Sequence, residues 1–162
     1  MAVLLPAEAT RGLSARGDTD GDGDDDALIV LQNSGGDVSK FKPRKLIVLR
    51  RNSAGYLEKA VESADAILCQ RCGGMMGDPL QQIRVGHGEF TLRFEGGSRE
   101  LWSSEFKFEY FRGQGVWKLT EIFFADTDRL EGTSKEQRKG PADFGEVSLQ
   151  EFDAAYLSDA SP

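Results

Sequence analysis

The chain has 162 residues, and its 27 acidic and 20 basic side chains give a formal net charge of −7. This length suits one domain over residues 1–162 with a substantial buried core. The sequence shows no basic stripe of the kind that binds nucleic acid, and no apolar run reaches the roughly 18 residues that a membrane-spanning helix needs. Residues 1–7 contain an apolar patch but no basic start, and they are too short for a complete export signal.

The first predicted element is an aspartate-rich loop at residues 17–26. Four aspartates occupy relative positions one, three, five and nine of the loop: Asp18, Asp20, Asp22 and Asp26. Carboxylates at this spacing can converge on one hard cation, Gly23 at position six permits a sharp turn, and the carbonyl of Asp24 at position seven adds an oxygen. The spacing therefore predicts a structural calcium site (Ca²⁺). The alternative is a solvated, flexible acidic loop.

The predicted calcium loop leads into β-structure. Position twelve of the loop is Ile29, so the bidentate glutamate of an EF-hand is missing, and the residues that follow favour a strand over a helix. Strands are predicted over residues 27–32 and 45–50, where successive apolar residues indicate central strands that are buried on both faces. A hairpin turn at residues 52–55 leads to a further strand at 56–61.

The second half of the chain predicts a meander with glycine-rich turns. Its strands are expected over residues 81–85, 89–95, 101–111 and 116–124. In the longest of them, Phe106 and Phe108 lie on one side while Glu105 and Lys107 lie on the other, which is typical of a half-buried strand. The expected fold is mainly β: an antiparallel meander, arranged as a sandwich or as an irregular propeller-like sheet.

The last part of the chain gives weaker signals. Residues 126–145 are polar, and we expect a mobile excursion there. Residues 146–156 are expected to supply a last strand or a short helix. The tail at residues 157–162 is expected to fray.

Two cysteines, Cys69 and Cys72, are separated by two residues. A zinc site is disfavoured because His87 is the single histidine, and a redox-active pair would need a strand-to-helix setting that is not predicted here. A small structural disulfide is the preferred interpretation, and it would place the protein outside the cytosol. Two buried free thiols are the remaining alternative.

The cysteines open a glycine-rich loop that contains Met75 and Met76. Adjacent methionines in such a loop can form an adaptable contact surface. The alternative, with equal weight, is that both side chains fold back under the sheet.

The sequence does not indicate an enzyme. His87 lies between two glycines in a predicted turn, where a solvated side chain is a simpler interpretation than a general base. None of the common nucleophile, phosphate-binding, zinc-protease or dinucleotide motifs is present. A glycosidase-like pair among the strand carboxylates is an alternative, but alternation on solvated faces explains those residues more simply.

Several segments together resemble a family of small secreted or periplasmic bacterial proteins with FG-GAP- or VCBS-like calcium loops. The segments that carry this resemblance are residues 17–32, 43–49, 69–79 and 90–117. Some members look similar to immunity proteins that neutralise peptidoglycan-hydrolase toxins delivered by bacterial killing secretion systems. The resemblance implies a calcium-bearing, propeller-like β fold, export to the periplasm, and calcium positions at Asp18, Asp20, Asp22, Asp24 and Asp26.

We therefore expect a calcium-stabilised periplasmic inhibitor that blocks a lysozyme-like, cell-wall-degrading enzyme. Its protein partner would be a secreted peptidoglycan hydrolase. The candidate contact loops are residues 72–78, 86–88 and 96–99, with Met75, Met76, His87 and Arg99 as candidate contact residues. The alternative is a calcium-dependent surface- or glycan-binding module that inhibits no enzyme.

Overall fold

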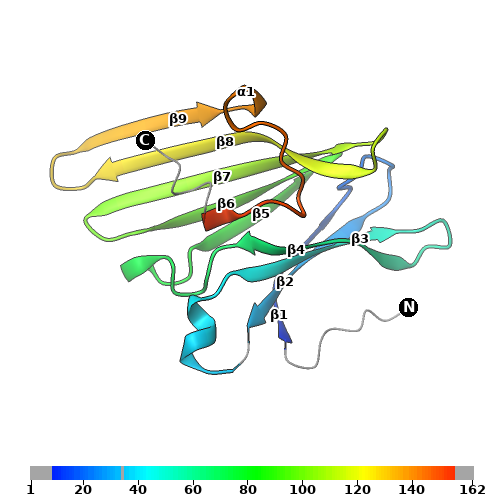
Figure 1. Ribbon diagram of the computed structural model, residues 1–162, viewed down its shortest axis with the longest axis horizontal. Coiled ribbons are helices and arrows are strands. Elements are labelled where there is room, and N and C mark those ends of the chain that lie inside the picture. The colour runs from blue at the N-terminus through cyan, green and yellow to red at the C-terminus, as the bar shows by residue number, and fades with distance from the viewer. Residues whose placement is uncertain (1–8, 34, 156–162) are drawn as a thin grey trace.

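In the computed structural model, which describes residues 9–33 and 35–155, the strands form two antiparallel sheets (Figure 1). The first sheet contains β1 (Ala9–Gly17), β2 (Asp26–Asn33), β3 (Arg44–Arg51) and β4 (Leu57–Ile67). The second contains β5 (Leu80–Gly86), β6 (Glu89–Gly97), β7 (Glu100–Phe111), β8 (Val116–Asp128) and β9 (Thr133–Lys139). The described part of the chain also contains the short helical segments η1 (Asp37–Phe41), η2 (Gly74–Met76) and α1 (Pro141–Phe144).

Each sheet is a meander, because its strands lie side by side in chain order. Among the described strands neither sheet closes into a barrel, so the arrangement is that of a sandwich or an open meander. The prediction of a mainly β, antiparallel fold is confirmed.

One hydrophobic core joins the two sheets. Leu28 on β2 and Leu46 on β3 belong to the same buried cluster as the aromatic side chains of the second sheet. Phe106 and Phe108 on β7 are fully buried, as the alternating pattern predicts. Phe152, from the segment after α1, places its ring centroid 4.9 Å from the centroids of both. The C-terminal part of the chain therefore completes the core.

The two central strands of the first sheet are buried on both faces, which confirms the prediction from their continuous apolar runs. Alternate residues of β2 and β3 face the common core. The residues between them form a second, smaller cluster on the opposite face: Ala27, Ile29, Leu31, Ile47 and Leu49.

Residues 126–145, predicted as a mobile excursion, form regular structure instead. β8 continues as far as Asp128, and β9 pairs with it over the register from Asp128↔Thr133 to Ile122↔Lys139. The side chains of β9 are polar and mostly exposed, so its sequence lacks the apolar alternation that identifies a strand. Main-chain hydrogen bonds to β8 define this strand, and the residue pattern does not report them.

The remaining differences lie at the two ends of the chain. β1 adds a strand that the sequence pattern did not predict. In residues 146–155, Ser148 forms an isolated β-bridge with Lys118 of β8, and the side chain of Leu149 is buried. The predicted frayed tail at residues 157–162 lies outside the described residues.

Candidate metal centre

The aspartate-rich loop connects β1 to β2, and its own carboxylates hold its turns. The main-chain N–H groups of Asp22 and Gly23 donate to the two carboxylate oxygens of Asp18, each at 3.0 Å. The N–H of Asp24 donates to Oδ1 of Asp22 at 2.8 Å. Gly23 has φ +94°, a left-handed conformation that suits glycine, as its position in the loop predicts.

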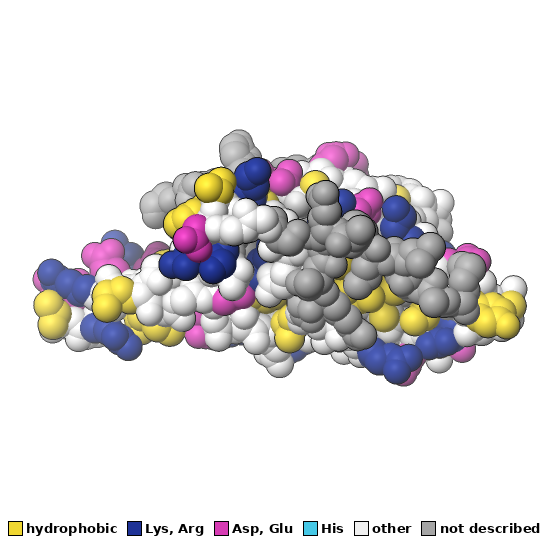
Figure 2. Space-filling model, turned by 90° about the horizontal axis from the view of Figure 1, so that it is seen from below, with side chains coloured by type: hydrophobic (Ala, Val, Ile, Leu, Met, Phe, Trp, Pro, Cys, Tyr) yellow, Lys and Arg dark blue, Asp and Glu magenta, His cyan; other side chains and the backbone are white. Residues whose placement is uncertain are grey.

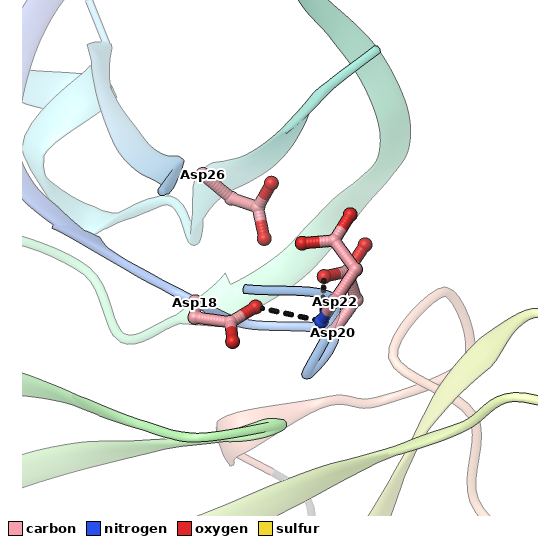
Figure 3. A group of neighbouring side chains, drawn as sticks. All are labelled: Asp18, Asp20, Asp22 and Asp26. Carbon is pink, nitrogen blue, oxygen red and sulfur yellow. Dashed lines mark hydrogen bonds between the residues drawn. The ribbon is translucent and has the colours of Figure 1, made fainter. Parts of the chain in front are cut away.

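Four carboxylates meet inside this loop. Each of Asp18, Asp20, Asp22 and Asp26 offers an oxygen, and the four oxygens lie within 4.8 Å of one another. Figure 3 shows the side chains turned toward a common centre from different sides of the loop. The carboxylate of Asp24 is not part of this group. The contribution predicted for Asp24 was its main-chain carbonyl, and that remains a prediction.

Two members of the group are buried, which makes their negative charge costly. Burial raises the pKa of Asp26, the charge of Asp20 acts in the same direction, and hydrogen bonds from Arg51 and Thr19 oppose the rise. Asp20 is buried and accepts from Nε of Arg50 at 2.5 Å. One arginine cannot balance four neighbouring carboxylates. The group can therefore hold a metal ion, and its all-oxygen donors suit a hard divalent cation.

The loop also makes direct contact with the second sheet. The N–H of Gly88 donates to the carbonyl of Asp18 at 2.8 Å, and Nε1 of Trp117 donates to the carbonyl of Thr19 at 2.8 Å. Nη2 of Arg112 donates to the carbonyl of Gly21 at 3.0 Å. The candidate metal centre therefore lies at the junction of the two sheets.

His87, a predicted partner-contact residue, lies at this junction. Its Nδ1 is 2.8 Å from Oδ2 of Asp18, while 77% of its side chain remains exposed. Sequence reasoning did not find Arg50, Arg112 or Trp117 as neighbours of the loop. They are far away in the chain, and only the pairing of the strands brings them to the aspartates.

The other candidate residues lie at the opposite end of the second sheet. Cys69 and Cys72 form a disulfide, which is the preferred interpretation from their spacing. The N–H of Gly97 donates to the carbonyl of Gly73 at 3.0 Å, so the cysteine loop lies against the turn between β6 and β7. Two of the three predicted contact loops, residues 72–78 and 96–99, are thus neighbours. The third, residues 86–88, lies beside the candidate metal centre.

Met75 and Met76 differ in their surroundings. Met75 is 88% exposed, which contradicts the alternative that it folds back under the sheet. Met76 is partly exposed and lines a groove of about 200 Å³, together with Leu101 and Trp102 of β7. Arg99 lies nearby in the chain, with Nη2 3.5 Å from Oδ2 of Asp128.

Comparisons with family models, curated proteins and solved structures find no match to this chain. Among the described residues, no helix has both the length and the apolar character needed to cross a membrane. The fold and the candidate metal centre are therefore the basis for assigning a function.

Proposed function

We propose that this protein is a calcium-stabilised inhibitor that acts in the periplasm and blocks a lysozyme-like, cell-wall-degrading enzyme. The observation that carries the proposal is the group of four aspartates at the junction of the two sheets. The inhibitory role and the periplasmic location come from the resemblance of the calcium loop and neighbouring segments to immunity proteins. The Cys69–Cys72 disulfide supports a site of action outside the cytosol.

Calcium suits the aspartate group better than magnesium does. Calcium accepts six to eight oxygen ligands in flexible geometry, whereas magnesium demands near-octahedral geometry and keeps several waters. The four carboxylates come from a short loop with two left-handed glycines, Gly21 and Gly23, and such a loop suits the flexible geometry of calcium. A bound calcium ion supplies the positive charge that Arg50 alone does not.

The position of the aspartates links metal binding to inhibition. Asp18, Thr19 and Gly21 already contact the second sheet through their carbonyls, so a loop that is held by a cation also holds the two sheets together. A rigid scaffold reduces the conformational entropy that a binding surface loses when it meets its partner. Calcium would thus act on inhibition through the fold and would not touch the enzyme.

The enzyme-contact surface is proposed at the end of the second sheet that carries Met76 and Arg99. Met76 lines the groove beside Leu101, and an apolar groove can receive a side chain from a partner. Arg99 is largely exposed and can donate to a carboxylate of the kind that glycosidases use in catalysis.

The test is the clearing of purified peptidoglycan by a lysozyme-type muramidase, with and without this protein, in calcium-containing buffer. We expect the protein to slow clearing and to have no hydrolytic activity when the muramidase is omitted. Met76→Ala and Arg99→Ala should each weaken inhibition by about tenfold while the melting temperature stays unchanged. The matched control is Lys135→Ala, on the exposed strand β9.

A different set of results would contradict the proposal. If the protein binds peptidoglycan but leaves the activity of the muramidase unchanged, it is a glycan-binding module. If Met76→Ala or Arg99→Ala lowers inhibition and the melting temperature together, the contact assignment is wrong.

A further inference from the structure

Three large apolar side chains are exposed on two short helical turns at the end of the molecule away from the metal centre. Val38 and Phe41 belong to η1 and are 73% and 65% exposed, and Met75 belongs to η2. We call this surface the apolar tip and define it by Val38, Phe41 and Met75. Isolated exposed apolar residues are ordinary, but a group of them at one end of a protein marks an interaction surface.

About 35 residues separate the two turns in the chain, and the disulfide loop that leads into η2 contacts η1. The N–H of Arg71, next to the disulfide, donates to the carbonyl of Lys40 in η1 at 3.0 Å. Nη2 of Arg71 also lies 3.9 Å from Oδ1 of Asp37. Figure 2, which views the molecule from below, shows hydrophobic, basic and acidic side chains interspersed on this face.

Polar contacts hold these turns in place. The side-chain amide of Asn33 lies within hydrogen-bond distance of the carbonyls of Ser39, Lys42 and Pro43, at 3.0–3.3 Å. The guanidinium of Arg44 is buried and makes two hydrogen bonds to the carboxylate of Asp78, at 2.8 and 2.7 Å. The apolar tip is thus presented on braced turns, which lowers the entropic cost of docking.

Basic residues outnumber acidic ones beside the apolar tip, in a chain that is acidic as a whole. Lys40, Lys42 and Arg71 lie on or beside the two turns. The acid of η1, Asp37, lies 3.4 Å from Lys40 and 3.9 Å from Arg71, and Asp78, after η2, is paired with the buried Arg44.

The acidic loop lies at a distance from this basic group. Five aspartates of the calcium loop lie before β2 and Asp26 begins it, whereas η1 follows it. The eight residues of β2 span roughly 25 Å, which exceeds the screening length of about 8 Å at physiological ionic strength. The acidic loop therefore does not cancel the positive charge at the tip.

We propose that the apolar tip docks on an anionic membrane surface. Lysine and arginine attract acidic headgroups, and apolar side chains on projecting turns can insert at the boundary between headgroups and acyl chains. The charge distribution orients the molecule, with the calcium loop directed away from the bilayer. Docking would keep an exported protein close to the cell that made it. The inference stands whether or not the protein inhibits an enzyme.

The experiment is flotation of the full chain with vesicles of phosphatidylglycerol and phosphatidylcholine in equal parts, and with vesicles of phosphatidylcholine alone. We expect binding to the anionic vesicles that falls as salt is raised. Phe41→Ser combined with Met75→Ser should weaken the partition by about tenfold, and Lys42→Glu with Arg71→Glu by a similar factor. All four side chains are exposed, so unchanged melting temperatures should accompany the loss.

Matched controls use exposed residues away from the tip. Tyr56→Ser alters the turn between β3 and β4, beside the calcium loop, and Lys135→Glu alters β9. Both should bind vesicles as the unaltered chain does. Oxidation of Met75 by dilute peroxide gives a second readout, because docking should protect its thioether.

Other results would overturn the proposal. No flotation with anionic vesicles, or equal flotation of the tip variants, would reject the membrane as the occupant. Loss of flotation in Asp22→Asn but not in the tip variants would show that calcium bridges the acidic loop to the lipid. Protection of Met75 without vesicles would indicate a second copy if sedimentation shows a dimer, or an acidic protein if protection requires the muramidase.

Discussion

Asp22 and Asp25 are both exposed residues of one loop, yet they differ in what their carboxylates can do. The carboxylate of Asp22 belongs to the group of four, whereas that of Asp25 does not, and Asp25 contributes its carbonyl to Nε of Arg51. Asparagine has the shape of aspartate without the charge. Comparing the two positions therefore separates metal binding from loop shape.

We expect Asp22→Asn to weaken calcium binding by about tenfold or more, because affinity in such loops depends on the number of charged ligands. Asp25→Asn should bind calcium as the unaltered chain does. Calorimetric titration measures both affinities, and circular dichroism without calcium checks that the fold is intact. Equal affinities for the two variants would contradict the assigned ligands.

A second residue-scale prediction concerns Glu62 on β4. Nζ of Lys45 donates to this carboxylate at 2.6 Å, and that hydrogen bond holds the pKa of Glu62 below its ordinary value of 4.5 despite partial burial. The folded state therefore binds this proton less tightly than the unfolded chain does. The pair stabilises the fold above the ordinary pKa, and its contribution is lost as the pH falls through the lower folded value.

Glu62→Gln should lower the free energy of unfolding by a few tenths to about 1 kcal/mol near pH 7, since both side chains are about one-third exposed and water screens the pair. Near pH 3 the difference between variant and unaltered chain should shrink. Urea unfolding at the two pH values measures this difference in the free energy of unfolding. Lys45→Met should give the same pattern, and a pH-independent difference would contradict this explanation.

At the scale of elements, Arg44 connects β3 to the cysteine loop. Its guanidinium donates to the carbonyl of Leu68 and to both carboxylate oxygens of Asp78, and it is almost completely buried. Removing one partner of a buried pair leaves the other charge poorly compensated. Because Asp78 is partly exposed, water can solvate its carboxylate when Arg44 is removed, and this reduces the loss of stability.

Arg44→Met should therefore lower the free energy of unfolding by about 2–3 kcal/mol and increase hydrogen exchange over residues 69–79. Arg84→Met is the matched control, because Arg84 forms an exposed ion pair with Glu105, and its loss should cost less than about 1 kcal/mol. Similar losses for the two variants would show that the Arg44 pair does not brace the loop.

At the scale of the whole molecule, the candidate metal centre joins the two sheets. The loop belongs to the first sheet, and its carbonyls accept hydrogen bonds from Gly88, Arg112 and Trp117 of the second. A ligand that binds the folded state alone raises its stability by mass action. Calcium should therefore stabilise the packing of both sheets and not the loop alone.

Chelation should lower the melting temperature by several degrees, and it should increase hydrogen exchange at residues 86–88 as well as in the loop. Scanning calorimetry and exchange mass spectrometry measure these effects. In Asp22→Asn, which binds calcium more weakly, the chelator should lower the melting temperature by less than in the unaltered chain. If the chelator leaves the melting temperature of the unaltered chain unchanged, the calcium assignment is wrong.

Local patterns predicted much of this protein. The spacing of aspartates and glycines identified a loop in which four carboxylates converge, since such a loop closes within nine residues. Period-two alternation identified strands such as β6 and β7, and continuous apolar runs identified the two that are buried on both faces. The two cysteines are close enough in sequence for their spacing to suggest the disulfide.

Only the tertiary structure decided what surrounds these features. β9 is a strand because it pairs with β8, and no apolar pattern marks it. Strand pairing also brought Arg50 and Trp117 to the aspartate-rich loop, buried Arg44 against Asp78, and placed the predicted contact loops at two different ends. A local pattern records which way a side chain faces along its own strand. The contacts between distant segments depend on register and on the packing of the sheets, which no short stretch of sequence contains.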